Sequence, residues 1–141
     1  MNTLGKNVFC LTMFTLSLAS SQAIADVAII VNPANSATIS IDEVKSLFSG
    51  RQKGFSDGKT ALILSLDESD AARSEFNNKV LGKTDAQMKA YWSKLLFTGK
   101  GTPPKEISAS EMLQLVADNP NTIGYIDAAG VTDAVKVVAT F

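Results

Sequence analysis

The polar residues between Leu66 and Arg73 are the first candidates for chemistry in this chain. Asp67, Glu68, Ser69 and Asp70 follow an apolar run over residues 61–66, and apolar residues at helical spacing begin directly after them. This pattern predicts a buried strand that leads into the N-terminus of a helix. Such a junction presents unpaired backbone N–H groups and the positive end of the helix dipole. It is therefore a natural place to hold a small anion.

The same residues also fit a purely structural interpretation. Ser69 has the side chain of an N-cap, which stabilises a helix by about 1 kcal/mol. Asp67 and Asp70 could cap in the same way, because acidic residues are favoured in a first helical turn. Arg73 is either a solvated charge or a bidentate donor to an oxyanion or carboxylate. From the residues alone, both interpretations of the turn stay open.

Nucleophilic catalysis has few residues to work with. The chain has no histidine, which excludes Ser-His-Asp and Cys-His mechanisms, and Cys10 is its only cysteine. A Ser-x-x-Lys pair occurs at Ser56 and Lys59, but in a turn-rich loop and not at a helix start. We therefore expect a protein that is not an enzyme and that carries no cofactor.

Metal binding is also not expected. Asp67, Glu68 and Asp70 are close enough in sequence to contact one divalent cation. A calcium loop of the EF-hand type needs a longer pattern with a closing glutamate, and the sequence does not contain it. We therefore predict no metal-binding residues.

The first 25 residues have the pattern of a cleaved signal peptide. Lys6 precedes a short apolar run over residues 8–18, and small residues end in Ala-x-Ala at Ala25. We expect cleavage after Ala25, which leaves residues 26–141 as one exported domain. Cleavage also removes the only cysteine, and an exported domain without disulfides fits the bacterial periplasm.

Charge and hydropathy limit the partners of that domain. The formal net charge is −1, and loss of Lys6 makes it one unit more negative. This balance favours neither nucleic acid nor an anionic membrane surface as a partner. No second apolar run is long enough to cross a bilayer, so we expect no membrane insertion after cleavage.

Periodicity and capping patterns predict an α/β fold. Apolar runs predict strands at 27–31, 61–66, 123–126 and 135–138. Capping-box spacing at Ser40, Thr84 and Ser108 predicts three helix starts, and a fourth helix follows the Ser69 turn as far as Gly82. The expected architecture is a single mixed β-sheet flanked by helices.

Two aromatic residues in the helix after Thr84 are further candidates. Trp92 shares a stripe with Met88 and Leu95, so its spacing favours packing in the core. Tyr91 lies off the centre of that stripe and is the better candidate for a surface role.

The order of four motifs resembles that of phosphate ABC transporter substrate-binding proteins, in the type 2 periplasmic-binding-protein superfamily. The motifs are a helix ending in Phe48-Ser49-Gly50, a polar loop with Asp57-Gly58, the Ser69 turn, and a late Asn-Pro-Asn-Thr-Ile-Gly-Tyr-Ile element at 119–126. The segment from Tyr91 to Pro104 looks like that of their short, single-domain relatives. The resemblance covers nearly all of residues 26–141 and implies about one lobe of such a protein.

The resemblance also implies a ligand site. Where those proteins have Ser-Gly-Thr, this sequence has Ser69, Asp70 and Ala71, and Arg73 follows within one turn. In the family this turn holds phosphate through backbone N–H groups and hydroxyls at a helix N-terminus. Here Asp70 adds a negative charge, and Ala71 removes a hydroxyl.

Two functions follow as hypotheses. The first is an exported, periplasmic solute-binding-like protein that holds a small oxyanion at this turn and meets an ABC permease, as the resemblance implies. The second is a non-catalytic interaction or scaffold module that has lost ligand binding and docks an envelope protein or pairs with itself.

Overall fold

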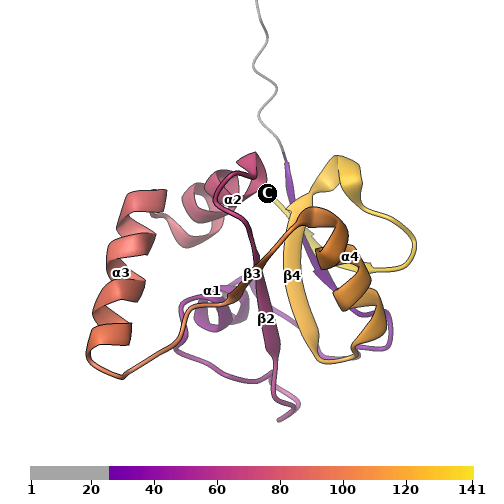
Figure 1. Ribbon diagram of the computed structural model, residues 1–141. Helices are drawn as coiled ribbons and strands as arrows, with labels where there is room; N and C mark the ends of the chain where they lie inside the picture. Colours follow the sequence, from indigo (N-terminus) through magenta and orange to yellow (C-terminus); the bar gives the residue numbers. More distant parts are fainter. Residues whose placement is uncertain (1–25) are drawn as a thin grey trace, which may run out of the picture.

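The computed structural model describes residues 26–141, so the predicted signal peptide lies outside the described residues. Residues 26–141 form five strands and four α-helices (Figure 1). The strands are β1 (Val27–Val31), β2 (Leu62–Leu66), β3 (Lys105–Ile107), β4 (Thr122–Asp127) and β5 (Lys136–Thr140). The α-helices are α1 (Ile41–Phe48), α2 (Ala71–Phe76), α3 (Asp85–Phe97) and α4 (Ala109–Asp118). A π-helical turn, η1 (Asn77–Leu81), continues α2, and a 3₁₀ turn, η2 (Ala128–Gly130), follows β4.

The strands form one mixed sheet in the order β3-β2-β4-β1-β5. β2 runs parallel to β3 and β4, whereas β1 pairs antiparallel with β4 and β5. The expected α/β fold with a single mixed sheet flanked by helices is therefore confirmed. The short edge strand β3 was not predicted, because three residues after a proline pair give no period-2 signal.

Helices cover both faces of the sheet. The Tyr125 ring of β4 contacts Phe48 of α1 and Phe76 of α2. The neighbouring Gly124 faces Met112 of α4. Because successive residues of a strand point to opposite faces, α4 covers the face opposite to α1 and α2. In Figure 1, α4 lies to the right of β4, and α3 stands at the far left.

The predicted helix starts are correct at three of the four helices. The side chains of Ser40, Thr84 and Ser108 each accept a backbone N–H bond as N-caps. At α2 the N-cap is Asp70, whose carboxylate accepts the N–H of Ala72, and not Ser69. The N-cap role considered for Ser69 is therefore wrong, and the same role considered for Asp70 is confirmed.

The apolar stripe of α3 does not reach the core as expected for Trp92. Only Met88 of this helix is buried, whereas Trp92 is half-buried and Leu96 is 53% exposed. The helix joins the rest of the fold at a few points, among them the Tyr91 hydroxyl, which donates to the Ser49 carbonyl at 2.5 Å. The prediction for Trp92 was wrong because this side chain lines a cavity between α3 and the rest of the fold and is therefore not enclosed.

Across residues 26–141, every helix is too short or too polar to pass through a membrane.

Candidate functional site

The turn after β2 is held by its own hydrogen bonds. The N–H of Asp70 donates to the Asp67 carbonyl at 3.0 Å, and the N–H of Arg73 donates to the Asp70 carbonyl at 3.0 Å. The Asp70 carboxylate accepts the Ala72 N–H at 2.9 Å. Several backbone donors at the start of α2 are therefore already used within the chain, and an incoming anion would compete with the Asp70 carboxylate.

The four residues proposed from the sequence do not share one environment. Ser69 and Ala71 are exposed, and Asp70 is half-buried by its capping contact. Arg73 points the other way, into a cavity that Ser69, Asp70 and Ala71 do not line. The structure thus places three of these residues along the outside of the turn and the fourth inside the molecule.

Arg73 is fixed by two contacts. Its guanidinium donates to the Leu66 carbonyl at 3.0 Å and forms an ion pair with Glu106 at 2.7 Å. The Arg73 side chain is only 17% exposed. Glu106 lies on β3 directly beside Ser65 of β2, so this ion pair links α2 to the edge of the sheet.

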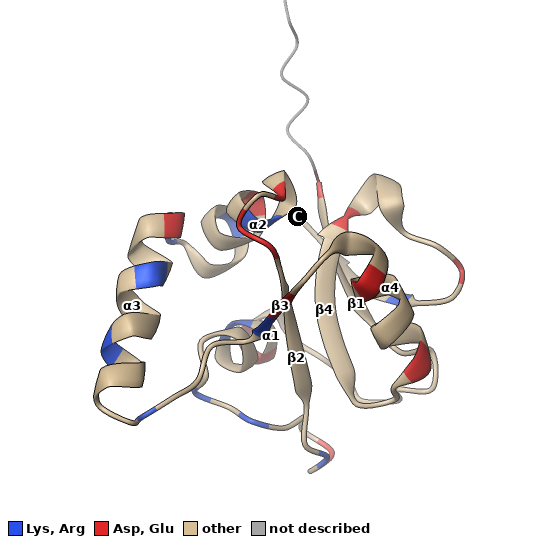
Figure 2. Cartoon of the chain, viewed as in Figure 1, with Lys and Arg blue, Asp and Glu red and all other residues tan. Residues whose placement is uncertain are grey.

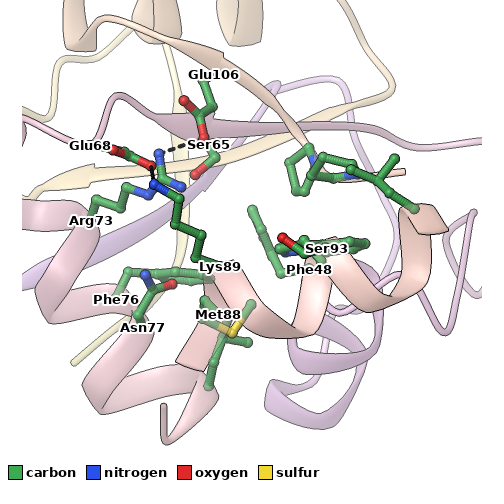
Figure 3. Close-up of a pocket in the computed structure, with 15 residues that line it drawn as sticks. Phe48, Ser65, Glu68, Arg73, Phe76, Asn77, Met88, Lys89, Ser93 and Glu106 are labelled. Carbon is green, nitrogen blue, oxygen red and sulfur yellow. Dashed lines mark ion pairs between the residues drawn. The ribbon is translucent and has the colours of Figure 1, made fainter. Parts of the chain in front are cut away.

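The cavity beside Arg73 has a volume of about 200 Å³ and lies between α3 and the rest of the fold (Figure 3). We call it the α3 cavity. Its apolar lining comes from α1, α2, η1, α3 and the loop before β3, through Phe48, Phe76, Leu81, Met88, Trp92, Leu96, Pro103 and Pro104. Its polar lining consists of Ser65, Glu68, Arg73, Asn77, Lys89, Ser93 and Glu106.

The charges of the α3 cavity balance. Arg73 faces Glu106, and Lys89 of α3 lies 3.9 Å from Glu68. Figure 3 shows both ion pairs on one side of the cavity and Phe76 and Met88 on another. The cavity therefore joins an apolar wall to a polar side without net charge.

Tyr125 lies beneath the polar side of the cavity. Its hydroxyl lies 2.7 Å from the Ser65 hydroxyl and accepts the Leu66 N–H at 3.3 Å. Burial raises the pKa of Tyr125 to about 12, so its phenol stays protonated at neutral pH. It is a neutral structural support for Ser65 and not an acid or base.

The start of α3 is attached to α2 and η1 through Asp85. Its carboxylate accepts hydrogen bonds from Ser74 and from Asn77, the latter at 2.8 Å. The hydrogen bond from Ser74 is the largest cause that lowers the pKa of Asp85, with smaller contributions from Asn77 and the Arg73 charge, while burial acts in the opposite direction. These contacts set the distance between α3 and α2, and hence the width of the α3 cavity.

Sequence reasoning missed Glu106 and Lys89. Glu106 lies in the unpredicted strand β3, and Lys89 lines the cavity with a side chain that is 76% exposed. The one spacing signal for Lys89 is that it lies four residues before Ser93, which shares its helix face and also lines the cavity. No pattern in the sequence pairs Glu106 with Arg73.

Metal ligands do not gather in the part of the chain that the structure describes. No three side chains of His, Cys, Asp or Glu there come close enough together to hold an ion.

Comparisons with known proteins identify the fold. No protein-family model matches the sequence, and no curated protein matches it significantly. Solved structures do match. An ABC-type phosphate transport receptor from Vibrio cholerae superposes with a TM-score of 0.61 at 20% identity, over 81% of this chain and 46% of the receptor.

Further solved structures of the same kind also match. A phosphate ABC transporter substrate-binding protein with bound phosphate, from Clostridium perfringens, gives a TM-score of 0.58 at 18% identity, over 81% of this chain and 45% of its own. PstS from Borrelia burgdorferi gives a TM-score of 0.60 at 14% identity, over 82% of this chain and 47% of PstS. This chain thus spans about half the length of these receptors. The expected resemblance is confirmed at the level of the fold, which is that of one lobe of a phosphate ABC transporter substrate-binding protein.

Proposed function

We propose that this protein is a non-catalytic, exported solute-binding module of the periplasm. The observation that carries the proposal is the single-lobe fold shared with phosphate transport receptors. The absence of histidine from the whole sequence supports a binding role over a catalytic one, because it removes the commonest general base. In this proposal the module delivers its solute to an ABC permease.

The proposed ligand is a small oxyanion at the turn between β2 and α2. Ser69, Asp70 and Ala71 supply the turn, and Arg73 anchors it from inside the molecule. One of the matching receptors is described with bound phosphate, which supports this class of ligand. The Asp70 carboxylate opposes it, because a like charge about 4 Å away costs about 1 kcal/mol in water-like surroundings. We therefore expect weak binding, at the level of millimolar dissociation constants.

Isothermal titration of the purified protein with phosphate and sulfate tests this proposal. A saturable heat at millimolar anion is the expected result. A folded protein that gives no heat with either anion contradicts the ligand-binding function.

Replacing Asp70 locates the site. Asp70→Asn removes the negative charge and keeps a residue that caps helices well. We expect phosphate to bind about fivefold more tightly, which corresponds to the removal of about 1 kcal/mol of repulsion. Asp133→Asn makes the same change of charge in the loop before β5 and should leave the affinity unchanged. Equal affinities in all three proteins would mean that the anion binds elsewhere.

The second candidate function is an interaction or scaffold module. It is favoured by α3, where Leu96 is 53% and Phe97 is 94% exposed, and by the match to only half of each receptor. Exposed large apolar residues at one helix end are typical of a protein contact. Light scattering together with a pull-down from periplasmic extract tests it. A strictly monomeric protein that retains no partner would rule it out.

A further inference from the structure

The α3 cavity differs in chemistry from the turn that precedes α2. Three aromatic rings, those of Phe48, Phe76 and Trp92, contribute to its apolar lining. Phe48 and Phe76 are buried and fixed by an edge-to-face contact with centroids 4.7 Å apart, whereas Trp92 is half-buried. Phe48 and Phe76 are only 2% and 1% exposed, so they close the floor of the cavity, and Trp92 offers the ring that a flat apolar group can contact.

The two ion pairs of the cavity differ in strength. Arg73 and Glu106 are 2.7 Å apart, and Arg73 is mostly buried and also bonded to the Leu66 carbonyl. Lys89 and Glu68 are 3.9 Å apart, with side chains 76% and 65% exposed. An exposed pair of this kind contributes little to stability, because water screens it. Lys89 and Glu68 can therefore separate and each take a charged group of a ligand.

The charge balance selects the class of ligand. A bare oxyanion beside Lys89 would also face the Glu68 carboxylate, and a bare cation beside Glu68 would face Lys89. A molecule with a carboxylate and an ammonium group satisfies both side chains at once. The volume of about 200 Å³ lies below the range of about 300–1,000 Å³ for drug-sized ligands, so the molecule is small.

We propose that the α3 cavity binds a small zwitterion with a flat apolar side chain, of the class of aromatic α-amino acids. Lys89 binds its carboxylate, Glu68 binds its ammonium group, and the side chain lies against the accessible apolar lining, that is Trp92, Leu96 and Pro103-Pro104. Ser65 and Ser93 add hydroxyls to the same lining. The inference rests on the proposed function in one respect, that the chain binds small solutes, and it places a different class of solute at a different site.

Trp92 provides the measurement, because it is the only tryptophan of the chain and it lines the cavity. Titration of the purified protein with L-phenylalanine should change its fluorescence in a saturable way. 3-Phenylpropionate, which has no ammonium group, and phenethylamine, which has no carboxylate, should each bind at least about tenfold more weakly. The loss of one charged hydrogen bond is sufficient for a change of this size.

Two lysines of α3 provide a matched pair of variants. Lys89→Met should weaken L-phenylalanine binding at least about tenfold, because Lys89 lines the cavity. Lys94 lies on the same helix but outside the cavity lining, so Lys94→Met should leave L-phenylalanine binding unchanged. Glu68→Gln should weaken binding of L-phenylalanine and of phenethylamine but not that of 3-phenylpropionate. The side chains of Lys89 and Glu68 are both exposed, so the fold should tolerate their replacement.

The outcomes separate this inference from the proposed function. Saturable binding that depends on Lys89 and on both charged groups of the ligand supports the inference. Phosphate heat without any response to L-phenylalanine overturns it and leaves the proposed function intact. Loss of binding to the same extent in the Lys89 and Lys94 variants overturns the assigned site. A protein that binds neither phosphate nor L-phenylalanine contradicts both proposals.

Discussion

At the scale of single residues, the adjacent residues Gly124 and Tyr125 of β4 have opposite packing roles. Tyr125 fills space between the sheet and α1 and α2, and its ring stacks on Phe76 with centroids 3.9 Å apart. Gly124 leaves space on the other face, where Met112 of α4 approaches the backbone. Both residues belong to the element that resembles phosphate-receptor sequences, and the structure gives each a packing reason. Their identities are therefore explained by the fold before any ligand is considered.

The buried phenol of Tyr125 should ionise at a higher pH than an exposed tyrosine. In a Tyr91→Phe protein, Tyr125 is the only tyrosine left, and its ionisation should appear near pH 12 and not near 10. Because the folded pKa is raised, stability is full below the unfolded pKa of about 10 and is lost as the pH rises toward 12. Ultraviolet absorbance of tyrosinate measures the ionisation. A midpoint near pH 10 while the protein remains folded would contradict the burial of this side chain.

A side chain at Gly124 should lower the stability of the fold. A Cβ atom there would lie 2.2 Å from the Met112 sulfur, and Met112 is fully buried. We expect Gly124→Ala to lower the free energy of unfolding by about 1–3 kcal/mol, the usual cost of overpacking. Gly130→Ala is the control, because its nearest contact would be 3.9 Å away. Urea denaturation measures both proteins, and equal stabilities would show that α4 moves aside freely.

At the scale of elements, α3 and α4 begin alike and are used differently. Each starts with a complete capping box, at Thr84 and Gln87 or at Ser108 and Glu111. Yet α4 buries Met112 and Val116 against the sheet, whereas α3 buries Met88 alone. In Figure 2, α3 carries lysines along its length, whereas the charged residues of α4 are all acidic. Helix α3 therefore has fewer buried residues to hold it than α4, and we expect it to be the element that moves when the α3 cavity opens.

Removing the two caps should separate these roles. Ser108→Ala should lower the global free energy of unfolding by about 1 kcal/mol, because α4 is part of the core. Thr84→Ala should instead speed amide hydrogen exchange within α3 and change the global value less, because α3 can open locally. Exchange rates and urea denaturation of both variants test this. Equal global losses would mean that α3 unfolds together with the sheet.

At the scale of the whole molecule, stability should be insensitive to pH over the neutral range and fall in acid. The chain has no histidine, whose side chain would titrate there. Asp85 and Glu111 have pKa values lowered by hydrogen bonds from Ser74 and from the Ser108 backbone, respectively. A lowered folded pKa gives stability that is present above the unfolded value and lost as the pH falls through the folded one.

Replacing Asp85 should flatten this acid response. Asp85→Asn loses the favourable charge, so its free energy of unfolding should be lower than that of the parent protein at neutral pH. The difference should shrink as the pH falls below 3.8, the ordinary value for aspartate, because the parent then loses the same charge. Urea denaturation over this range measures it, and a difference independent of pH would contradict the assignment.

The sequence by itself determined the local features of this protein. Ser40, Thr84 and Ser108 cap helices because a cap needs only the next three residues. The apolar runs at 27–31 and 61–66 became β1 and β2, since strand periodicity is also local. These signals in order were enough to predict one mixed sheet flanked by helices, and the resemblance to phosphate-binding proteins.

The tertiary structure alone decided what those elements face. The Glu43 carboxylate, at the position of a capping-box partner, accepts the N–H of Ser56 instead, because the loop after α1 folds back onto it. Trp92 and Met88 share one stripe, but only Met88 meets enough of the fold to be buried. Arg73 pairs with Glu106, which is distant in sequence, because β3 lies beside β2. Burial and ion pairing depend on which surfaces the chain brings together, and no spacing within one segment encodes that.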